Sequence, residues 1–397
     1  MASFSVRFLG CKVSYADAQA VRERLLSEGH VEAADVAEVA VVNTCCVTHE
    51  AVSKSRQAVS RAARAHRRVY VTGCAANLAG AFESVAPNVR VLAGPSEDAP
   101  AAVAGDVGAL GCLRAESRLE RTRAFVKIQD GCSFSCAFCV IPLVRGATRS
   151  RRAGAVLGEI ARRVAQGHRE IVLTGVNLGC FRDREAGYAL PRLIRQAGAL
   201  PGVERLRLSS IEVNHLTDDV VAALRETETA SLHLHVPLQS GDDGVLRAMR
   251  RRYSAAQYRA KLEPLDDFNL TADVIVGFPG EDEAAFRRTL DVVRDAGLTR
   301  VHAFPYSPRP GTTTAAVDTV SVAEKKDRSA CLRALSDELS RRRWASRIGS
   351  TDRVLVDRPS RGYGDDYTPW LVAGEVGQLL LARAVGVSEE GILAVAA

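Results

Sequence analysis

Long apolar runs are missing from this chain of 397 residues. No stretch reaches the ~18 consecutive apolar residues that a membrane helix needs. The opening MASFSVRFLGCKV also lacks the basic flank and long apolar core of a signal peptide. We therefore expect a cytoplasmic protein with no membrane contact. Hydrophobic residues make up 47% of the sequence and charged residues 25%, an ordinary globular composition that argues against disorder, a fibre or a coiled coil.

Two common nucleotide-binding patterns are absent as well. No Gly-x-Gly-x-x-Gly follows the first predicted strand, which argues against a dinucleotide-binding Rossmann domain. The run Gly277-Phe-Pro-Gly-Glu281 could be mistaken for a phosphate loop, but it lacks the Gly-Lys-Ser/Thr of a Walker motif. A nucleoside triphosphatase is therefore excluded.

Positive charge is concentrated in the middle of the chain. The net charge is +6, and residues 119–343 hold essentially all of the excess. Dense basic runs lie there at 145–152, 247–252 and 341–343. Such runs can neutralise phosphates, although each taken singly is equally well explained as a solvated helix face. Three runs in one region favour a polyanionic partner.

The first ~95 residues alternate between short Val-rich runs and helical patterns. Strands are expected at 5–10, 39–45, 69–74 and 89–94, with helices at 16–28 and 52–68 between the first three. This alternation predicts an α/β domain over 1–95 with a parallel sheet and crossover helices. Residues 96–118, rich in Gly and Pro, are expected to form a linker with some helix.

The alternation resumes over 119–343. Six strands are expected, separated by helical patterns such as 155–166 and 281–296, at 124–130, 170–177, 204–210, 231–239, 271–279 and 300–307. Six β/α repeats predict a partial (β/α)₆ barrel, short of the eight of a closed one. A basic helix over 322–347 then leads into residues 344–397, where strands at 353–357 and 377–385 predict a small β-barrel.

Three of the ten cysteines fall close together, in Gly131-Cys132-Ser-Phe-Ser-Cys136-Ala-Phe-Cys139. The spacing is C-x₃-C-x₂-C, directly after a predicted strand, and loops after barrel strands are where chemistry takes place. Three thiolates can bind three irons of a cubane cluster and leave the fourth iron open. Zinc is the rival metal, but structural zinc sites have four ligands. Unliganded thiols are the third alternative.

Three further cysteines each end, or closely follow, a predicted strand of the first domain. They are Cys11, Cys45 and Cys74. Since the carboxyl ends of parallel strands share one edge of a sheet, we expect these cysteines to converge on a second metal cluster. Buried structural thiols are the alternative, because free cysteine is among the most buried residue types. Cys46 would point to the opposite side from Cys45 if the strand continued, so it is expected to be packed, as are Cys112, Cys180 and Cys331.

With these motifs in this order, the chain resembles the radical SAM methylthiotransferases over nearly its whole length. The Cys132–Cys139 loop, with Phe138 before its last cysteine, resembles the radical SAM signature. The residues Gly364-Asp-Asp-Tyr-Thr-Pro resemble part of a TRAM domain. The resemblance implies two [4Fe–4S] clusters and S-adenosylmethionine as cofactors. Cys132, Cys136 and Cys139 would bind the radical SAM cluster, and Cys11, Cys45 and Cys74 an auxiliary one.

The surroundings of the first cysteine distinguish branches of that family. Gly10-Cys11-Lys12-Val13 is similar to the branch that acts on threonylcarbamoyladenosine at position 37 of tRNA, although Ser14 replaces the usual Asn. That branch inserts sulfur and a methyl group at carbon 2 of the adenine. The branch acting on isopentenyladenosine and the branch modifying a ribosomal-protein aspartate are the alternatives. A non-catalytic iron–sulfur or zinc protein that binds nucleic acid is the alternative of another class.

The resemblance also implies partners and a binding site for S-adenosylmethionine. The partners would be the tRNA anticodon stem-loop and an electron donor such as flavodoxin or ferredoxin. Polar residues at or just past barrel strand ends could bind the zwitterion and ribose of S-adenosylmethionine, with an aromatic side chain near its adenine; the candidates are Asn177, Ser210, Glu212, Gln239 and Phe138. Caps and loop hydrogen bonds are the simpler explanation for the polar residues. Radical chemistry of this kind requires no histidine or carboxylate dyad, and none is assigned.

Overall fold

The computed structural model describes residues 2–33, 36–82, 85–108 and 122–397. Residues 109–118 of the expected linker, with Cys112, therefore lie outside the described residues. The chain forms two compact units. The first comprises residues 1–118, 130–149 and 309–315; the second comprises 119–129, 150–308 and 316–397. Among the described residues, no helix is both long enough and apolar enough to cross a membrane.

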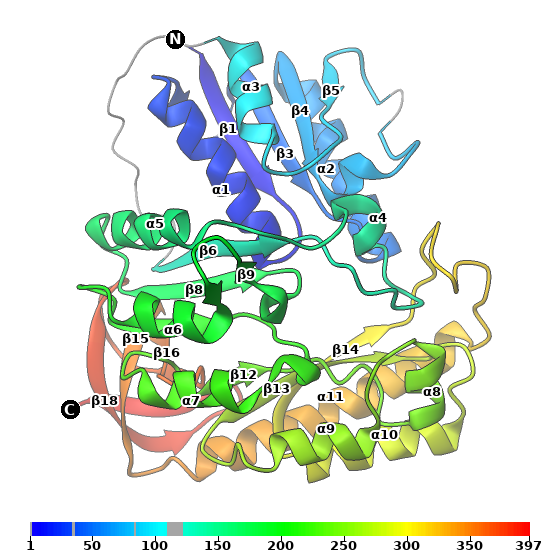
Figure 1. Ribbon diagram of the computed structural model, residues 1–397, viewed down its shortest axis with the longest axis vertical. Helices are drawn as coiled ribbons and strands as arrows, with labels where there is room; N and C mark the ends of the chain where they lie inside the picture. The colour runs from blue at the N-terminus through cyan, green and yellow to red at the C-terminus, as the bar shows by residue number, and fades with distance from the viewer. Residues whose placement is uncertain (1, 34–35, 83–84, 109–121) are drawn as a thin grey trace. The chain divides into compact units, whose positions relative to one another are not determined.

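The first unit is built on a parallel sheet with the strand order β2-β1-β3-β4-β5 (Figure 1). The strands are β1 (Ser3–Phe8), β2 (Val31–Glu32), β3 (Val39–Thr44), β4 (Arg68–Gly73) and β5 (Val89–Val91). The helices are α1 (Lys12–Ser27), α2 (His49–Ala65), α3 (Ala99–Val107) and α4 (Ile141–Arg145), with a 3₁₀ turn η1 (Cys74–Asn77). The predicted parallel α/β arrangement is confirmed, with element ends shifted by a few residues.

Helices cover both faces of this sheet, and every residue of β3 is therefore buried. Val39 and Val41 pack with α1 and α3 in one cluster, whereas Ala40 and Val42 pack with α2 in another. Alternate residues of a strand point to opposite faces, so a strand with apolar residues on both faces belongs in the middle of a two-sided sheet. The α2 helix begins where the Thr48 hydroxyl accepts the Ala51 N–H.

The second unit contains six parallel strands in chain order, each paired with the next. They are β6 (Arg123–Asp130), β8 (Glu170–Gly175), β11 (Arg205–Leu208), β12 (His233–His235), β13 (Asn269–Val276) and β14 (Leu298–Pro305). β11 and β12 are joined by isolated bridges, such as the one between Ser210 and His235. Three short strands were not predicted and lie outside this set of six: β7 (Arg149–Ser150), β9 (Arg182–Asp183) and β10 (Tyr188–Ala189). The arrangement is the predicted partial (β/α)₆ barrel, which stays open.

Helices follow the barrel strands and supply one continuous apolar core. They are α5 (Ala153–Ala165), α6 (Leu190–Gly198), α7 (Asp218–Glu226), α8 (Asp243–Ala248), α9 (Ala255–Leu262), α10 (Glu283–Asp295) and α11 (Val322–Ala345), with 3₁₀ turns η2 (Leu178–Cys180) and η3 (Val213–His215). The start of α11 is fixed by a capping box, in which Ser321 and Glu324 satisfy each other's backbone N–H groups.

The C-terminal residues close into a five-stranded barrel. Its strands are β15 (Thr351–Arg358), β16 (Arg361–Tyr363), β17 (Pro369–Leu371), β18 (Leu379–Val387) and β19 (Ile392–Ala396). Trp370 fills its core and is fully buried. Pairing around the ring leaves no free edge strand, as expected for the predicted small β-barrel.

A buried ion cluster joins this barrel to the rest of the second unit. Glu170 at the start of β8 lies 3.1 Å from Arg205 and 2.9 Å from Arg207, and all three side chains are at most 2% exposed. Arg205 also donates to Asp365, and Arg207 to the Gly364 carbonyl, both on the C-terminal barrel. Burial raises the pKa of Glu170, but the charges of the neighbouring arginines outweigh it and hold the pKa at about 2.

Candidate metal centre

Cys11, Cys45 and Cys74 follow three adjacent strands of the first unit. Cys45 directly follows β3 and Cys74 directly follows β4, whose last residues, Thr44 and Gly73, are register partners. Gly73 has a φ of +87°, and a Cβ there would lie 2.6 Å from the Thr44 carbonyl oxygen. Glycine is required at this position because only it permits both the left-handed backbone and the close approach. The two cysteines are therefore held side by side.

Cys11 reaches the same edge through Gly10. The Gly10 φ is +117°, and a Cβ at that position would lie 3.2 Å from the Cys45 Sγ. Cys11 is the N-cap residue of α1, and its Sγ lies 3.8 Å from the hydroxyl of Ser14. The three cysteines that the sequence singled out thus follow strands along the same edge of the sheet, with Cys45 and Cys74 buried and Cys11 exposed.

A buried arginine contacts this group, and the sequence analysis did not single it out for such a role. The Arg145 Nε donates to the Cys74 Sγ at 3.0 Å. Its Nη1 donates to both carboxylate oxygens of Asp130, at 2.9 and 3.1 Å, and its Nη2 donates to Asp17 at 2.9 Å. The Arg145 side chain is 5% exposed. One guanidinium therefore binds two buried carboxylates and one thiol sulfur.

The pKa values follow from these contacts. A hydrogen bond from the Cys46 thiol, with the charge of Arg145, lowers the pKa of Cys74 to about 7, although burial acts in the opposite direction. Burial raises the pKa of Cys45 to about 11, and the nearby charges of Cys74 and Cys11 add to the increase. The lowered pKa of Cys74 favours its thiolate, the form that binds metal, whereas the raised pKa of Cys45 favours its protonated thiol.

Cys46 is packed as expected, with no exposed surface. Its thiol does not point away from the other cysteines, because β3 ends at Thr44 and the alternation of a strand no longer applies. It donates to Cys74 instead, which raises its own pKa. Its carbonyl accepts from Arg309 at 3.4 Å.

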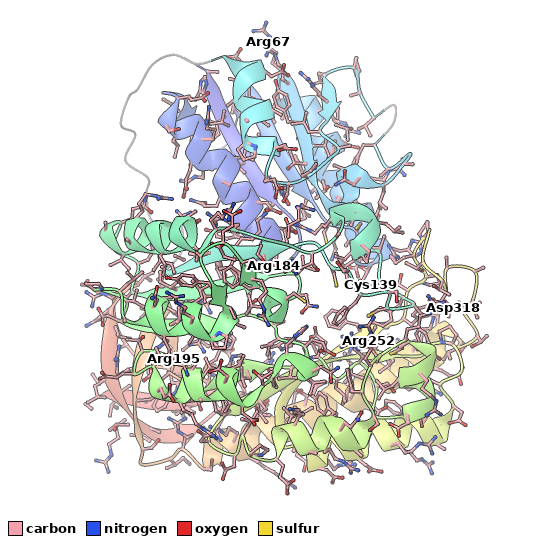
Figure 2. All side chains as sticks on the ribbon, viewed as in Figure 1. Arg67, Cys139, Arg184, Arg195, Arg252 and Asp318 are labelled. Carbon is pink, nitrogen blue, oxygen red and sulfur yellow. The ribbon has the colours of Figure 1, made fainter. Side chains whose placement is uncertain are left out.

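The loop after β6 carries the other three cysteines. The Cys132 N–H donates to the Gly146 carbonyl at 3.0 Å, which closes the loop onto the residues that follow α4. The Cys132 Sγ accepts the Phe134 N–H at 3.4 Å, a backbone hydrogen bond to sulfur of the kind that tunes iron–sulfur clusters. Cys132, Cys136 and Cys139 are all partly exposed, and Cys139 is labelled in Figure 2. Phe138 is also partly exposed.

The donor sets suit iron–sulfur clusters. Each consists of three cysteines, and thiolates are the ligands of such clusters. A hydrogen bond to a ligand sulfur and a nearby positive charge are levers by which proteins tune a cluster, and Arg145 supplies both to Cys74. Across the described part of the chain, no three His, Cys, Asp or Glu side chains lie close enough together to hold a single metal ion.

The polar candidates for binding S-adenosylmethionine all lie in the second unit. The buried Asn177 follows β8 and donates its N–H to the Gln129 side chain at 2.7 Å. Ser210 follows β11 and is partly buried. Gln239 adopts a left-handed backbone with φ of +67°. Glu212 caps η3 and lies 3.1 Å from Arg251, with both side chains at most 10% exposed.

Several arginines of the basic runs that the sequence offered to a polyanion form ion pairs with the protein's own carboxylates. Besides Arg145, the first run places Arg151 2.7 Å from Glu159 and Arg152 2.5 Å from Glu185. In the other two runs, Arg251 pairs with Glu212, Arg342 with Glu338 and Arg343 with Asp366. The partners are distant in sequence for most of these pairs, so the sequence alone could not reveal them.

Comparison with known proteins agrees with this architecture. Residues 126–293 match the radical SAM superfamily, and residues 3–94 match the uncharacterized protein family UPF0004. A radical S-adenosylmethionine methyltransferase, TsrM from Kitasatospora setae, solved with cobalamin and a [4Fe–4S] cluster, shares the fold. The TM-score is 0.56 at 13% identity, over 79% of this chain and 77% of that one. The chain is therefore a radical SAM protein.

Two relatives show to which family of radical SAM proteins the chain belongs. The threonylcarbamoyladenosine tRNA methylthiotransferase MtaB of Chlamydia pneumoniae is 32% identical over 98% of this chain and 97% of its own length. The tRNA-2-methylthio-N(6)-dimethylallyladenosine synthase of Sphingopyxis alaskensis is 34% identical over 93% of this chain and 90% of its own. The chain belongs to the radical SAM tRNA methylthiotransferase family and is an enzyme of that class. Its cofactors are two [4Fe–4S] clusters and S-adenosylmethionine.

Proposed function

We propose that this enzyme inserts sulfur and a methyl group at carbon 2 of threonylcarbamoyladenosine at position 37 of tRNA. We favour the threonylcarbamoyladenosine branch because of Gly10-Cys11-Lys12-Val13, which resembles the motif of that branch. These residues form the turn from β1 into α1. The full-length similarity to the Chlamydia pneumoniae enzyme supports it. The substrate would be the anticodon stem-loop, and the setting the cytoplasm.

In this proposal each part of the chain has one task. Residues 1–95 hold the auxiliary cluster on Cys11, Cys45 and Cys74, and 96–118 link them to the catalytic domain. Residues 119–343 hold the radical SAM cluster on Cys132, Cys136 and Cys139, and 344–397 form a TRAM-like β domain. When bound, the cofactors supply the adenosyl radical, the sulfur and the methyl group, chemistry that side chains alone do not provide.

The chain's own residues orient and shield these groups. Burial of Cys45 and Cys74, at 7% and 3% exposure, keeps water away from the sulfur-inserting site. Arg145 fixes the Cys74 thiolate and holds Asp130, the residue before the Gly131–Cys139 loop, in place. Asn177, Ser210, Glu212, Gln239 and Phe138 are our candidates for binding S-adenosylmethionine. An electron donor such as flavodoxin or ferredoxin would provide the reducing equivalents.

A second substrate has a specific argument in its favour. The Sphingopyxis alaskensis relative, named for dimethylallyladenosine, is as similar to this chain as the relative named for threonylcarbamoyladenosine. The two substrates share the adenine and differ in the group on its exocyclic nitrogen, so one active site chemistry serves both.

The test is mass spectrometry of tRNA nucleosides from a strain that lacks the gene. We expect loss of the 2-methylthio form of threonylcarbamoyladenosine and its return when the wild-type chain is supplied. Unchanged levels of that nucleoside, with loss of the methylthio form of the isopentenyl derivative, would transfer the enzyme to the second branch.

A further inference from the structure

The outer face of α2 carries positive charge that the protein does not neutralise. Residues 49–68 contain six basic side chains and one acidic side chain. In the described part of the chain, Arg56, Arg61 and Arg64 form no ion pair, whereas Lys54 pairs with Glu50 and Arg67 with Glu38. In the basic runs of the second unit, by comparison, five arginines form ion pairs: Arg151, Arg152, Arg251, Arg342 and Arg343.

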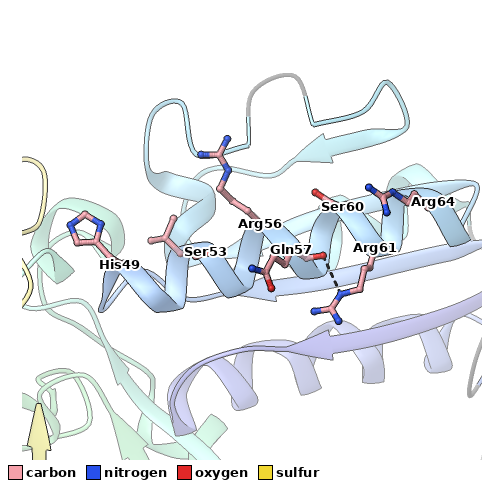
Figure 3. A pocket seen from close by; sticks show the side chains of 8 residues that line it. His49, Ser53, Arg56, Gln57, Ser60, Arg61 and Arg64 are labelled. Carbon is pink, nitrogen blue, oxygen red and sulfur yellow. Dashed lines mark hydrogen bonds between the residues drawn. The ribbon is translucent and has the colours of Figure 1, made fainter. Parts of the chain in front are cut away.

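These charges lie along one hollow. A cavity of about 710 Å³ follows the helix and is lined by Ser53, Arg56, Gln57, Ser60, Arg61 and Arg64, together with residues toward His49 (Figure 3). Arg56 and Arg64 stand two turns apart, roughly 12 Å along the axis at 1.5 Å per residue. The Arg61 Nε donates to the Gln57 carbonyl at 3.3 Å, and the Arg61 side chain is exposed.

The opposite face of the same helix is fixed to the cysteine site. Ser55 is fully buried, and its hydroxyl accepts the Cys45 N–H at 3.1 Å and lies 3.2 Å from the Cys45 carbonyl. A helix with its side chains is about 10–12 Å across. The basic hollow is therefore about one helix diameter from the residue that we assign to the auxiliary cluster.

We propose that the hollow on α2 binds the phosphate backbone of the RNA substrate. Arginine matches phosphate with paired N–H donors, and Ser and Gln side chains commonly bond phosphate and sugar oxygens. The lining contains one apolar residue, Val52, and no aromatic residue, whereas protein interfaces depend on aromatic and apolar anchors. This composition favours a nucleic acid over an acidic protein. The inference rests on the proposed action on tRNA.

The test is equilibrium binding of the full-length, reconstituted protein to a fluorescent, unmodified anticodon stem-loop over a series of salt concentrations. The variant Arg56→Ala/Arg61→Ala/Arg64→Ala should bind roughly 50-fold more weakly at ~0.15 M salt. Each lost phosphate contact removes about 0.7 from the slope of log K against log salt, as for single strands. The corresponding triple lysine variant should retain most of the slope, because lysine also neutralises phosphate.

A matched control removes the same charge elsewhere. Arg287→Ala/Arg294→Ala/Arg333→Ala acts on exposed positions of α10 and α11. It should change affinity by less than about threefold, because Arg287 and Arg294 already pair with Glu283 and Asp291 and exposed charges are screened by salt. An alanine triple variant that binds like the wild type with an unchanged slope would overturn the proposal. So would normal RNA binding combined with slower reduction by an acidic electron donor, which would assign the hollow to that protein.

Failure of this inference and failure of the proposed function are distinguishable. Backbone binding does not depend on which adenine modification is the substrate. If the substrate assignment is wrong, the wild type makes no methylthio product on threonylcarbamoyl RNA, yet the difference in salt slope between the wild type and the alanine triple variant persists. If the hollow is not the binding surface, product forms and the slopes coincide.

Discussion

Replacing Arg145 with Met should destabilise the first unit selectively. The substitution keeps an unbranched apolar stem but leaves the carboxylates of Asp17 and Asp130 buried without the guanidinium, and these side chains are 2% and 5% exposed. Removing one partner of a buried ion pair costs about 3–5 kcal/mol. At 1.4 kcal/mol per factor of ten, opening of this unit should become roughly two to three and a half orders of magnitude more frequent.

The chain offers an internal control for the assay. Its two tryptophans, Trp344 and Trp370, both lie in the second unit. Tryptophan fluorescence during denaturation should therefore be nearly unchanged in Arg145→Met. Hydrogen exchange followed by mass spectrometry should show the loss in peptides from α1, β3 and β4, measured on the cluster-free protein so that cofactor binding does not contribute.

Arg149→Met is the matched comparison. Arg149 lies 3.3 Å from Glu97, with the two side chains 37% and 53% exposed, and exposed pairs contribute about 0–1 kcal/mol. Adding Asp17→Asn and Asp130→Asn to Arg145→Met should restore part of the protection, because neutral amides tolerate burial better than carboxylates. Equal exchange in Arg145→Met and Arg149→Met would refute the reasoning.

Three further outcomes are expected. Cys132→Ala should abolish S-adenosylmethionine cleavage, whereas Cys45→Ala should retain cleavage and stop thiolation. Both results are measured by chromatography of the products. Normal methylthio product from Cys45→Ala would contradict the auxiliary role. The free energy of unfolding of the second unit should fall by ~3 kcal/mol as the pH decreases from about 4.5 through about 2. The reason is that folding depresses the pKa of Glu170, so its stabilising contribution is complete only above the pKa of the unfolded chain. Glu170→Gln should flatten this pH dependence, measured by tryptophan fluorescence during unfolding. Gly73→Ala should lower the iron content by about one cluster, whereas Gly80→Ala, also at positive φ but with open space around it, should retain both clusters.

Much of the architecture was predictable because it depends on short-range patterns. The Val-rich runs before Cys45 and Cys74 indicated buried strands, and parallel strands bring their carboxyl ends to one edge. In the structure Gly10 lies against Cys45, and Gly73, the residue before Cys74, lies against Thr44, the residue before Cys45; that the three cysteines bind one cluster stays a prediction. The spacing of the cysteines at 132–139 predicted a metal-binding loop without knowledge of the rest of the fold.

The role of Arg145 could not be predicted from its neighbours in sequence. It stands in a basic run and was expected to face a polyanion, but Asp17 is 128 residues away and only the fold brings the two together. Cys46 shows that local sequence also leaves the end of a strand uncertain. Its environment depended on whether β3 extended by two further residues, and an element end is less strongly encoded than the element itself.

The Glu170 cluster has a consequence for how the C-terminal barrel can be exchanged between relatives. Truncating the chain after α11 would remove the partners that Arg205 and Arg207 have on the C-terminal barrel. The shortened protein would then expose these two arginines and Glu170 at its surface. A transplanted barrel would succeed only if its own loop offered carbonyls and a carboxylate where Tyr363, Gly364 and Asp365 now stand. The sequence of the barrel loop is thus constrained by its contacts with Arg205 and Arg207, and the two parts must evolve together.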